Sequence, residues 1–436
     1  MAISMNGIKI TGKVSSRKLE IAPGYWFSTL ISGTLDSFDG AAIDSSNNLY
    51  VAGRTSNTPS PLIAKYSPSG TLIWQKELTG VTSGTASSIC IDGSDGIYVS
   101  GQVTTSGTVG ALTFKISSTG AILWQKKFYA GTGAASKSIA CTSAGTSYSA
   151  GSIQGGPIGN ADGFVVGYDS SGTKVLNRQI GTASSDSING IAVDSSGNFY
   201  VTGTSYDNGS GPTPPNLILL KFNSSGSAIW SAYISDATTA DGKAVIVDTS
   251  GNVYVTGITY QTGVGYDVLL AKFNSSGVFQ WAKSVGGTTS ESGTSLALDS
   301  SGNIYVLGYA PNSPYIMLLL KYNSSGSIVW QRSISGAGAL SGMWGNGVLI
   351  DSAGDMCISG VCGSTSDAIL IKLPANGTLT GTYGNLTYAA TSYTINTPTI
   401  TTGTPSLTVN STSYTPTTPT LSSTTSTLTS TTVTIA

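Results

Sequence analysis

A ten-residue phrase recurs seven times along the chain, and its spacing constrains the fold more than any other feature. The clearest copies are DSSGNFYVTG from Asp194, DTSGNVYVTG from Asp248 and DSSGNIYVLG from Asp299, and looser copies begin at Asp44, Asp92, Thr142 and Asp351. The glycines that close the seven copies lie 48, 50, 52, 54, 51 and 52 residues apart. A period of this size predicts an array in which every repeat forms one small sheet or one helix pair.

Each repeat contains four short β-strand patterns, called here strands A to D. In the fourth repeat we expect them at residues 189–194, 199–203, 217–222 and 227–234. The sequence DSSGN joins A to B, and NSSG at 223–226 joins C to D, as it does again at 274–277 and 323–326. Asp, Asn, Ser and Gly are the residues that tight hairpin turns require. The repeated phrases therefore indicate the same two hairpins in every repeat.

Strand A predicts how the sheets are arranged. Apolar residues stand one and three positions before the first residue of each phrase, and a small residue stands four positions before it. The small residues are Gly40, Ser88, Ser138, Gly190, Ala244, Ser295 and Gly347. Small residues let neighbouring sheets approach near an axis, and larger side chains fill the wedges between them. We predict an all-β fold: a seven-bladed β-propeller of four-stranded antiparallel blades, with a Thr/Ser-rich extended C-terminal β arm.

Closure of the ring is predicted from the tryptophans. Strand D carries a tryptophan in five repeats, at Trp74, Trp124, Trp230, Trp281 and Trp330. Trp26, in YWFSTLIS, lies 48 residues before Trp74 and precedes any strand A. We expect this segment to supply the outer strand of the blade that contains Asp351, because interleaved chain ends hide sheet edges. The alternative is that Leu379 and the following TGTYG form that strand.

Composition narrows the classes of function. The chain has 20 basic and 21 acidic residues, so it lacks the electrostatic footprint of a protein that binds nucleic acid or an anionic membrane. Its apolar runs are too short to span a bilayer, and the N-terminal residues lack the apolar core of a secretory signal. There is no histidine, and the four cysteines show no paired CxxC spacing. We expect no catalytic residues, no metal site and no cofactor.

The repeats resemble the bacterial seven-bladed β-propeller repeat (SBBP-type) family. Its pattern, AVD-x-x-GN-x-YV-x-G followed by a K-(F/Y)-(N/D)-x-x-G turn and a tryptophan strand, is matched at residues 185–230, 241–281 and 290–330. Degraded copies extend the resemblance over roughly residues 24 to 381. The resemblance implies the propeller fold. It implies little about function, because propellers include enzymes, scaffolds and binding modules.

Two sets of repeated polar residues have structural interpretations. The Asp that opens the phrase lacks the D-x-D-x-D-G spacing of a calcium loop, so we interpret it as a turn cap. A lysine recurs on strand C, at Lys65, Lys115, Lys221, Lys272, Lys321 and Lys372. We expect the stem of this lysine to pack beside the strand-D tryptophan and its ammonium to make a cation–π contact there.

Candidate binding residues lie where the repeat varies. The B–C and D–A connections share one face of the disc, and variable loops on a rigid scaffold commonly carry recognition. Their aromatic residues are Tyr206, Tyr260, Tyr266, Tyr309, Tyr315 and Trp344. Five positions before each phrase stands a polar residue, and we expect these seven to ring the mouth of the central channel: Asp39, Ser87, Lys137, Asn189, Lys243, Thr294 and Asn346. Lys137, Lys243, Asn189 and Asn346 are our binding candidates, and a merely hydrated rim is the alternative.

The C-terminal part of the chain has a different composition. No charged residue follows Lys372, and Thr and Ser dominate from Thr391 onward. Alternating apolar and β-branched residues favour strands, and a mucin-like stalk is the alternative. We therefore divide the chain into an N-terminal extension at 1–20, a propeller at 21–381 and an arm at 382–436. Because the backbone groups of isolated strands need partners, we expect the arm to pair with another subunit.

Two classes of function remain. The first is a non-enzymatic structural or binding protein, most concretely a component of a bacteriophage-like virion or surface fibre, attached through its termini. Its alternative within the binding class is a secreted or cell-surface adhesin that binds a host-surface glycan. The second class is a propeller lyase, glycosidase or quinoprotein-type enzyme, which needs convergent acid–base groups or metal ligands. Because the carboxylates are scattered among the loops, we expect no catalytic activity and a location on a virion or an extracellular surface.

Overall fold

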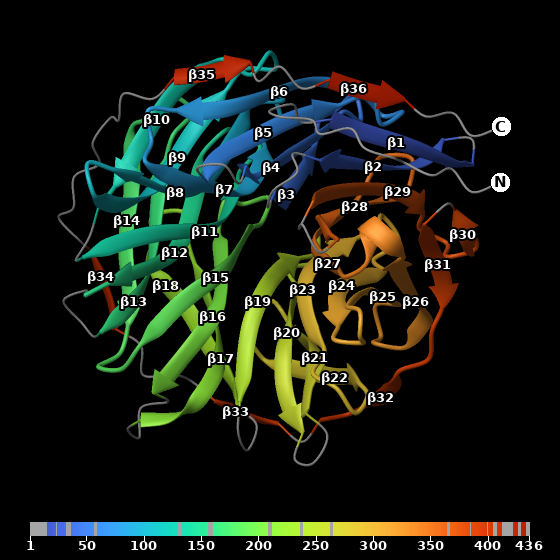
Figure 1. The fold of residues 1–436 in the computed structure, drawn as a ribbon. Coiled ribbons are helices and arrows are strands. Elements are labelled where there is room, and N and C mark those ends of the chain that lie inside the picture. Colours follow the sequence, from blue (N-terminus) through green and yellow to red (C-terminus); the bar gives the residue numbers. More distant parts are fainter. Residues whose placement is uncertain are drawn as a thin grey trace, which may run out of the picture.

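Seven antiparallel sheets surround a central axis in the computed structural model of this chain (Figure 1). The structure describes residues 15–22, 24–31, 36–55, 59–129, 132–155, 160–207, 212–235, 239–261, 265–363, 367–383, 385–398, 400–403, 408–411, 422–425 and 429–432. Within these ranges the one helical element is η1 (Gly338–Leu340), a 3-10 turn. The predicted all-β, seven-bladed propeller is confirmed.

Every blade has four core strands, A to D, ordered from the axis outward. Blade 1 contains β3 (Ser37–Ile43), β4 (Leu49–Thr55), β5 (Ser60–Tyr66) and β6 (Leu72–Thr79). Blade 2 contains β7 (Ser83–Ile91), β8 (Ile97–Thr105), β9 (Thr108–Ile116) and β10 (Ile122–Phe128). Blade 3 contains β11 (Gly133–Cys141), β12 (Ser147–Gln154), β13 (Ala161–Tyr168) and β14 (Lys174–Gly181). Blade 4 contains β15 (Asp186–Val193), β16 (Phe199–Asp207), β17 (Pro212–Phe222) and β18 (Ala228–Ser235).

The remaining blades continue the same order. Blade 5 contains β19 (Ala240–Val247), β20 (Val253–Gln261), β21 (Gly265–Phe273) and β22 (Phe279–Gly286). Blade 6 contains β23 (Ser292–Leu298), β24 (Ile304–Ala310), β25 (Ile316–Tyr322) and β26 (Ile328–Gly336). Blade 7 contains β27 (Met343–Ile350), β28 (Asp355–Cys362), β29 (Asp367–Pro374) and, from the N-terminal part of the chain, β2 (Tyr25–Ile31).

The two ends of the propeller interleave in blade 7. Strand β2 pairs with β29, with Trp26 opposite Lys372, so the predicted closure by the N-terminal segment is confirmed. The alternative is wrong, because the TGTYG segment contributes β30 (Gly381–Tyr383), which pairs with β31 (Leu386–Ala390) beside blade 6. Strand β1 (Ser15–Ala22) then adds to the outside of β2. Of the predicted extension at 1–20, residues 1–14 lie outside the described residues.

The C-terminal arm runs around the rim of the disc and adds outer strands to the chain's own blades (Figure 1). In chain order they are β31 on blade 6, β32 (Thr394–Asn396) on blade 5, β33 (Thr401–Gly403) on blade 4, β34 (Thr408–Ser411) on blade 3, β35 (Ser422–Thr425) on blade 1 and β36 (Thr429–Thr432) beside β1. The predicted β character of the arm is therefore seen. Its pairing is within the chain, and pairing with another subunit stays a prediction.

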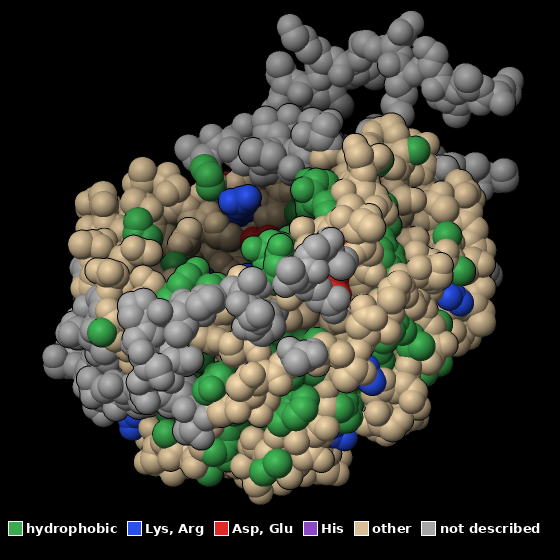
Figure 2. Space-filling model, turned by 90° about the horizontal axis from the view of Figure 1, so that it is seen from below, with side chains coloured by type: hydrophobic (Ala, Val, Ile, Leu, Met, Phe, Trp, Pro, Cys, Tyr) green, Lys and Arg blue, Asp and Glu red, His purple; other side chains and the backbone are tan. Residues whose placement is uncertain are grey.

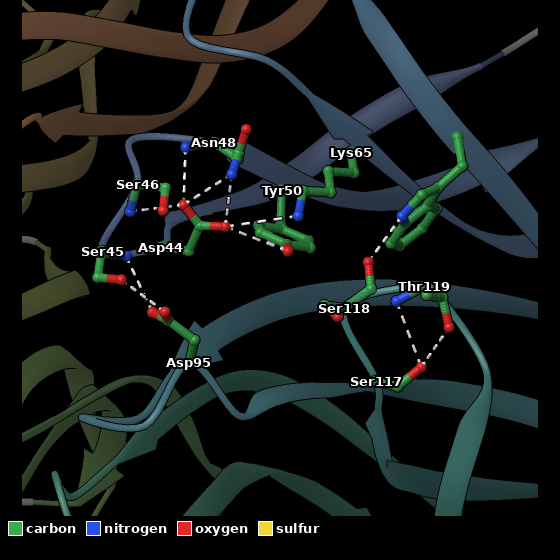
Figure 3. A network of polar contacts seen from close by, with 11 residues as sticks. Asp44, Ser45, Ser46, Asn48, Tyr50, Lys65, Asp95, Ser117, Ser118 and Thr119 are labelled. Carbon is green, nitrogen blue, oxygen red and sulfur yellow. Dashed lines mark hydrogen bonds and ion pairs between the residues drawn. The ribbon is translucent and has the colours of Figure 1, made fainter.

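The residue that opens each phrase caps its A–B turn, and it is Asp in six blades and Thr142 in blade 3. In blade 1, Asp44 Oδ1 accepts the backbone N–H groups of Ser46 at 3.0 Å and Asn48 at 2.8 Å, and Oδ2 accepts the Asn48 side chain at 2.9 Å (Figure 3). The Tyr50 hydroxyl also donates to this carboxylate, and Lys65 Nζ lies 3.5 Å from it. The repeated Asp, Asn, Tyr and Lys thus form one cluster at the end of the strand A–B hairpin.

The strand-C lysine contacts tyrosine, and our prediction of a tryptophan partner is wrong. Lys65 Nζ lies 4.8 Å from the centroid of the Tyr50 ring, and Lys221 Nζ lies 5.0 Å from that of Tyr200. Lys65 stands opposite Tyr50 on one side and Trp74 on the other. The carboxylate of Asp44 draws the ammonium toward the tyrosine side, because an ion pair adds to the cation–π attraction.

The strand-D tryptophan instead packs against the next blade. The indole N–H of Trp74 donates to Ser118 O of the blade 2 C–D turn at 2.9 Å (Figure 3), and Trp230 does the same to Ser275 O at 3.1 Å. The glycine of that turn has a positive φ, +80° at Gly277, and a Cβ there would lie 2.6 Å from the Trp230 ring. The NSSG phrase therefore serves both the turn and the contact between blades.

Strand A contains a β-bulge in every blade, and the glycine that closes the phrase makes the bulge possible. Where strands A and B pair, one strand-A residue in each blade is skipped. In blade 4, Ile188 pairs with Gly203 and Gly190 pairs with Thr202, so the residue between Ile188 and Gly190 has no partner on strand B. An ideal Cβ on the seven closing glycines would lie 1.7 to 2.2 Å from a strand-A carbonyl oxygen, which for Gly203 is that of Ser187. Any side chain at these positions would push the two strands apart.

We predict that Gly203→Ala destabilises the propeller by about 3 kcal/mol, because the bulge in blade 4 must open to accept the methyl group. Gly133→Ala is the matched control, because a Cβ there meets its nearest neighbour, Val109 Cβ, at an ordinary 3.6 Å. Thermal denaturation followed by circular dichroism compares the two variants. Equal melting temperatures would contradict this account of the closing glycine.

Candidate functional site

The seven polar residues predicted to ring the channel mouth are the bulge residues of strand A. They are the residues skipped in the A–B register: Asp39, Ser87, Lys137, Asn189, Lys243, Thr294 and Asn346. A bulge turns the extra residue out of the regular alternation, which is why a polar residue can stand among apolar neighbours. These same seven side chains line a cavity of about 460 Å³ at the mouth. Their predicted position is therefore seen, and their role in binding stays a prediction.

Hydrogen bonds join the ring from blade to blade. Lys137 Nζ donates to Asn189 Oδ1 at 2.8 Å, and Asn189 Nδ2 donates to Asp241 Oδ1 at 3.0 Å. Lys243 forms an ion pair with the same Asp241. Lys137 and Asn189 thus each contact the inner strand of the following blade, whereas Lys243 pairs within its own strand β19. The ring therefore has a structural role whether or not a ligand binds.

The ring also closes between blade 7 and blade 1. Asn346 Nδ2 donates to Phe38 O at 3.0 Å, and Thr294 Oγ1 donates to Gly345 O at 2.7 Å. Below the ring, a cavity of about 300 Å³ continues along the axis between the small strand-A residues. These residues are small because the strands nearly touch: a Cβ on Gly40 would lie 2.9 Å from Ser88 Cα.

A second pocket of about 250 Å³ opens beside the mouth. It is lined by Asp36, Ser37, Asp39, Arg54, Tyr309, Trp344, Asn346 and Val361, so it shares Asp39 and Asn346 with the ring. Figure 2 views the molecule from the side toward which β20 runs, and it shows a hollow in which basic, acidic and hydrophobic side chains meet. Aromatic and charged groups therefore converge where the last blades meet the first.

The six predicted aromatic residues separate into three groups. Tyr309, Tyr315 and Trp344 form a cluster, with ring centroids 6.0 Å apart for the tyrosine pair and 4.8 Å apart for Tyr315 and Trp344. Tyr260 and Tyr266 form a separate edge-on pair across one hairpin, at 5.4 Å. Tyr206 is 46% exposed on blade 4. Of these six residues, only Tyr309 and Trp344 line the pocket.

Two ring residues have shifted pKa values. Burial raises the pKa of Asp39 from 3.8 to about 6, although a hydrogen bond from Ser37 and the charge of Arg54 act in the opposite direction. Burial and the neighbouring charge of Lys243 lower the pKa of Lys137, against the attraction of Asp241. Perturbed groups at a cavity mouth are typical of functional sites.

Sequence reasoning missed several pocket residues, although a signal for them exists. The missed residues include Arg54 and Val361, which directly follow the glycine that closes the phrase, as the predicted Tyr309 does. They also include Ser37, which stands seven positions before the phrase, as the predicted Trp344 does. Both positions repeat as regularly as the ring position does. Comparison of all seven residues at these positions would have located this pocket.

The described residues offer little for a metal. Among them no group of three or more His, Cys, Asp or Glu side chains is arranged to hold a metal ion. All four cysteines are free thiols, at Cys90, Cys141, Cys357 and Cys362. Within the part of the chain that the structure describes, no helix is both long and apolar enough to cross a membrane.

Comparison with known proteins agrees with the fold. A family described as a β-propeller repeat (SBBP) matches residues 178–209. No curated protein shows significant similarity to the chain. Among solved structures, Sqt1 from Chaetomium thermophilum is similar over 84% of this chain and 99% of its own, with 9% identity and a TM-score of 0.44.

Two further similar structures are enzymes. The polysaccharide lyase Uly1 is similar over 78% of this chain and 90% of its own, with 9% identity and a TM-score of 0.43. A gluconolactonase from Xanthomonas campestris is similar over 84% of this chain and 99% of its own, with 11% identity and a TM-score of 0.37. Our expectation that the protein is not an enzyme is contradicted by these neighbours and is withdrawn. At such low identity and TM-score they assign no activity to this chain.

We predict that the Asp39 carboxyl titrates near pH 6, measured by 13C NMR of its side-chain carbon. Arg54→Gln should raise this pKa further, because the guanidinium stabilises the carboxylate. Arg178→Gln is the control, because Arg178 lies on β14 and donates to Gly226 O of the next blade. The folded-state pKa is raised, so the Asp39 contribution to stability is complete below about pH 4 and is lost as the pH rises through 6. A titration midpoint near 4 would contradict the prediction.

Proposed function

We propose that this chain, a seven-bladed β-propeller that carries the β-propeller repeat, binds a carbohydrate at the mouth of its central channel. The observation that supports the proposal is the pocket in which Tyr309 and Trp344 lie beside Asp39, Arg54 and Asn346. Small-molecule sites are typically concave, with apolar or aromatic walls and a few polar groups that fix orientation. This pocket has both features.

A sugar ring fits this chemistry. Its C–H face is apolar and packs on an aromatic ring, and its hydroxyls both donate and accept hydrogen bonds. Asp39 can accept from hydroxyls when it is ionised, Arg54 can only donate, and the Asn346 amide can do both. Tyr315 packs against Trp344, with the two ring planes tilted by 37°, and supports its orientation. Two carboxylates, Asp36 and Asp39, against one guanidinium give the pocket no excess positive charge, which favours a neutral sugar over an acidic one.

The neighbouring mouth gives room for more than one sugar ring. Its cavity of about 460 Å³ shares Asp39 and Asn346 with the pocket and adds Lys137, Asn189 and Thr294 around the axis. A glycan could extend from the aromatic wall across the ring of bulge residues. We therefore infer an oligosaccharide ligand, bound on the face of the disc that carries the B–C and D–A connections.

Trp344→Ala should weaken glycan binding about 10- to 30-fold, because truncating a central aromatic contact typically costs 1.4 to 2 kcal/mol or more. A panel of immobilised neutral and acidic glycans identifies a ligand, and isothermal titration then compares the variant with the wild type. Tyr206→Ala is the control, because Tyr206 is an exposed aromatic residue that does not line the pocket. Unchanged affinity in Trp344→Ala, or no binding to any glycan of the panel, would overturn the proposal.

Attachment to a larger particle is a second proposal, supported by the arm. Arm strands lie outermost on six of the seven sheets within the described residues, so their free edges are at the rim of the disc. An outermost strand can accept a further strand from a neighbour, which supplies assembly affinity. We propose that the propeller is displayed on a virion or surface fibre and that the rim makes the attachment.

Deletion of residues 391–436 removes β32 to β36 and should leave a folded disc, because all seven blades keep their four core strands and the Trp26 closure. We predict a lower melting temperature and loss of assembly, measured by circular dichroism and by incorporation into the native particle. Substitutions confined to the outer faces of the arm strands provide the matched control for stability. Normal incorporation of the truncated chain would place the attachment on the propeller faces instead.

A further inference from the structure

Acidic residues occupy two matched positions of the repeat, and they do so only as pairs. The first position lies five residues before the strand-C lysine site and holds Asp162, Asp267 and Asp367 in blades 3, 5 and 7. The second lies eight residues before the phrase and holds Asp186, Glu291 and Asp36 in blades 4, 6 and 1. Each acid of the first set therefore faces the blade that carries an acid of the second set.

The other four interfaces between blades have no acid at either position. The residue pairs there are Ser60 with Gly84, Gly110 with Ala134, Asn216 with Ala240, and Ile316 with Met343. An acid on one side alone does not occur. The two positions are therefore coupled, and the coupling must act between neighbouring blades.

Asp267 and Glu291 show the geometry of one pair. Their side chains are 1% and 0% exposed. Both converge on Gly286, where an ideal Cβ would lie 1.9 Å from Asp267 Oδ1 and 2.9 Å from Glu291 Oε2. Glu291 Oε2 accepts the N–H of Gly287 at 3.0 Å, and Asp267 Oδ1 has no hydrogen-bond donor among the described groups. The two carboxyl groups therefore adjoin the same point in the buried interface between blades 5 and 6.

Asp162 and Asp186 hold the matched positions between blades 3 and 4, and the charge of Asp162 acts on the Asp186 carboxyl. They are 0% and 2% exposed. Gln179 Nε2 donates to Asp162 Oδ2 at 2.6 Å, and Thr182 donates to Asp186 Oδ2 through its N–H at 2.6 Å and its hydroxyl at 2.8 Å. In the described part of the chain, Asp186 Oδ1 has no donor. One oxygen of Asp186 is thus held by Thr182, and the other oxygen is buried without a donor among the described residues.

We propose that each pair holds one proton shared between its two carboxyl groups, so that three of the seven interfaces between blades are tied together in acid and loosen as the pH rises. Two adjacent buried carboxyl groups cannot both ionise without strong repulsion, and they titrate as a unit. A carboxyl–carboxylate hydrogen bond is charge-assisted and therefore strong. Loss of the proton removes that bond and leaves two like charges in a buried interface.

The surroundings of the pairs support this assignment. Burial raises the pKa of Asp267 to about 6, with Glu291 acting in the same direction and a hydrogen bond from Ser284 against it. Burial also raises the pKa of Asp186, and the charge of Asp162 adds to this, against hydrogen bonds from Ser205 and Thr182. No lysine or arginine is among the groups that shift either pKa.

The other titratable groups near the pairs decide which pairs are suitable for an experiment. Tyr393 faces Glu291 and stays neutral, because burial and that charge raise its pKa. Asp36, of the third pair, shares its pocket with Arg54 and Asp39, so the test uses the first two pairs. Because the folded-state pKa of Asp267 is raised to about 6, its stabilisation is complete below about pH 4 and is lost as the pH rises through about 6.

Asp267→Asn tests the proposal in the full-length chain, because an amide replaces the shared proton with a permanent N–H donor. Calorimetric melting temperatures are measured from pH 4.5 to 8.5. We expect the variant to match the wild type at pH 4.5 and to exceed it by roughly 2 to 5 °C at pH 8.5. Glu291→Gln and Asp186→Asn should behave in the same way.

Asp194→Asn is the matched control, because the pKa of this turn carboxylate is shifted in the opposite direction to that of Asp267. Burial alone would raise the pKa of Asp194, but hydrogen bonds, chiefly from Asn198 and Tyr200, lower it. This control should therefore lose more stability at pH 8.5 than at pH 4.5. A melting temperature of Asp267→Asn that lies below the wild type by the same amount at both pH values would overturn the proposal, as would a 13C titration of Asp267 near pH 4.

Discussion

The contact between the closing glycine of strand B and a carbonyl oxygen of strand A determines much of this molecule. A Cβ at Gly203 would lie 1.9 Å from Ser187 O, so only glycine allows the two strands to keep their spacing through the bulge. The bulge then turns one polar side chain per blade toward the axis. Those seven side chains line the channel mouth, and Lys137, Asn189, Thr294 and Asn346 among them bond to the neighbouring blade. A single backbone constraint, repeated seven times, thus sets both the inner packing and the candidate site.

Contacts between blades use different chemistry at different distances from the axis. Near the axis, small residues such as Gly40 and Ser88 let the backbones nearly touch. Farther out, apolar side chains such as Ile63 and Phe114 from adjacent blades form the buried core, and at the rim each tryptophan packs under a turn glycine. At three interfaces, both blades contribute a buried carboxyl group. The ring therefore depends on neighbour contacts in every layer, as repeat proteins do.

The sequence predicted the features that repeat, because periodic spacing reports local structure directly. The turns, the ring positions and the closure by Trp26 follow from residues compared at equal positions. The pocket did not follow, because Arg54 and Trp344 meet only after blade 7 closes on blade 1. The lysine partner was wrong because Lys65 stands opposite both Tyr50 and Trp74, and the choice depends on a third residue, Asp44. The path of the arm could not be predicted, since any exposed sheet edge can accept a Thr-rich strand.

The order in which the arm strands lie has a mechanical consequence. They visit the blades in the reverse of chain order, from blade 6 back to blade 1, and the last of them, β36, runs parallel to β1 on blade 7 (Figure 1). A pulling force on the C-terminus would therefore load β36 first, then β35, and so on around the rim. Each short strand would detach singly at low force and release slack. The closed ring would remain unloaded until the last of them, β31, had come away.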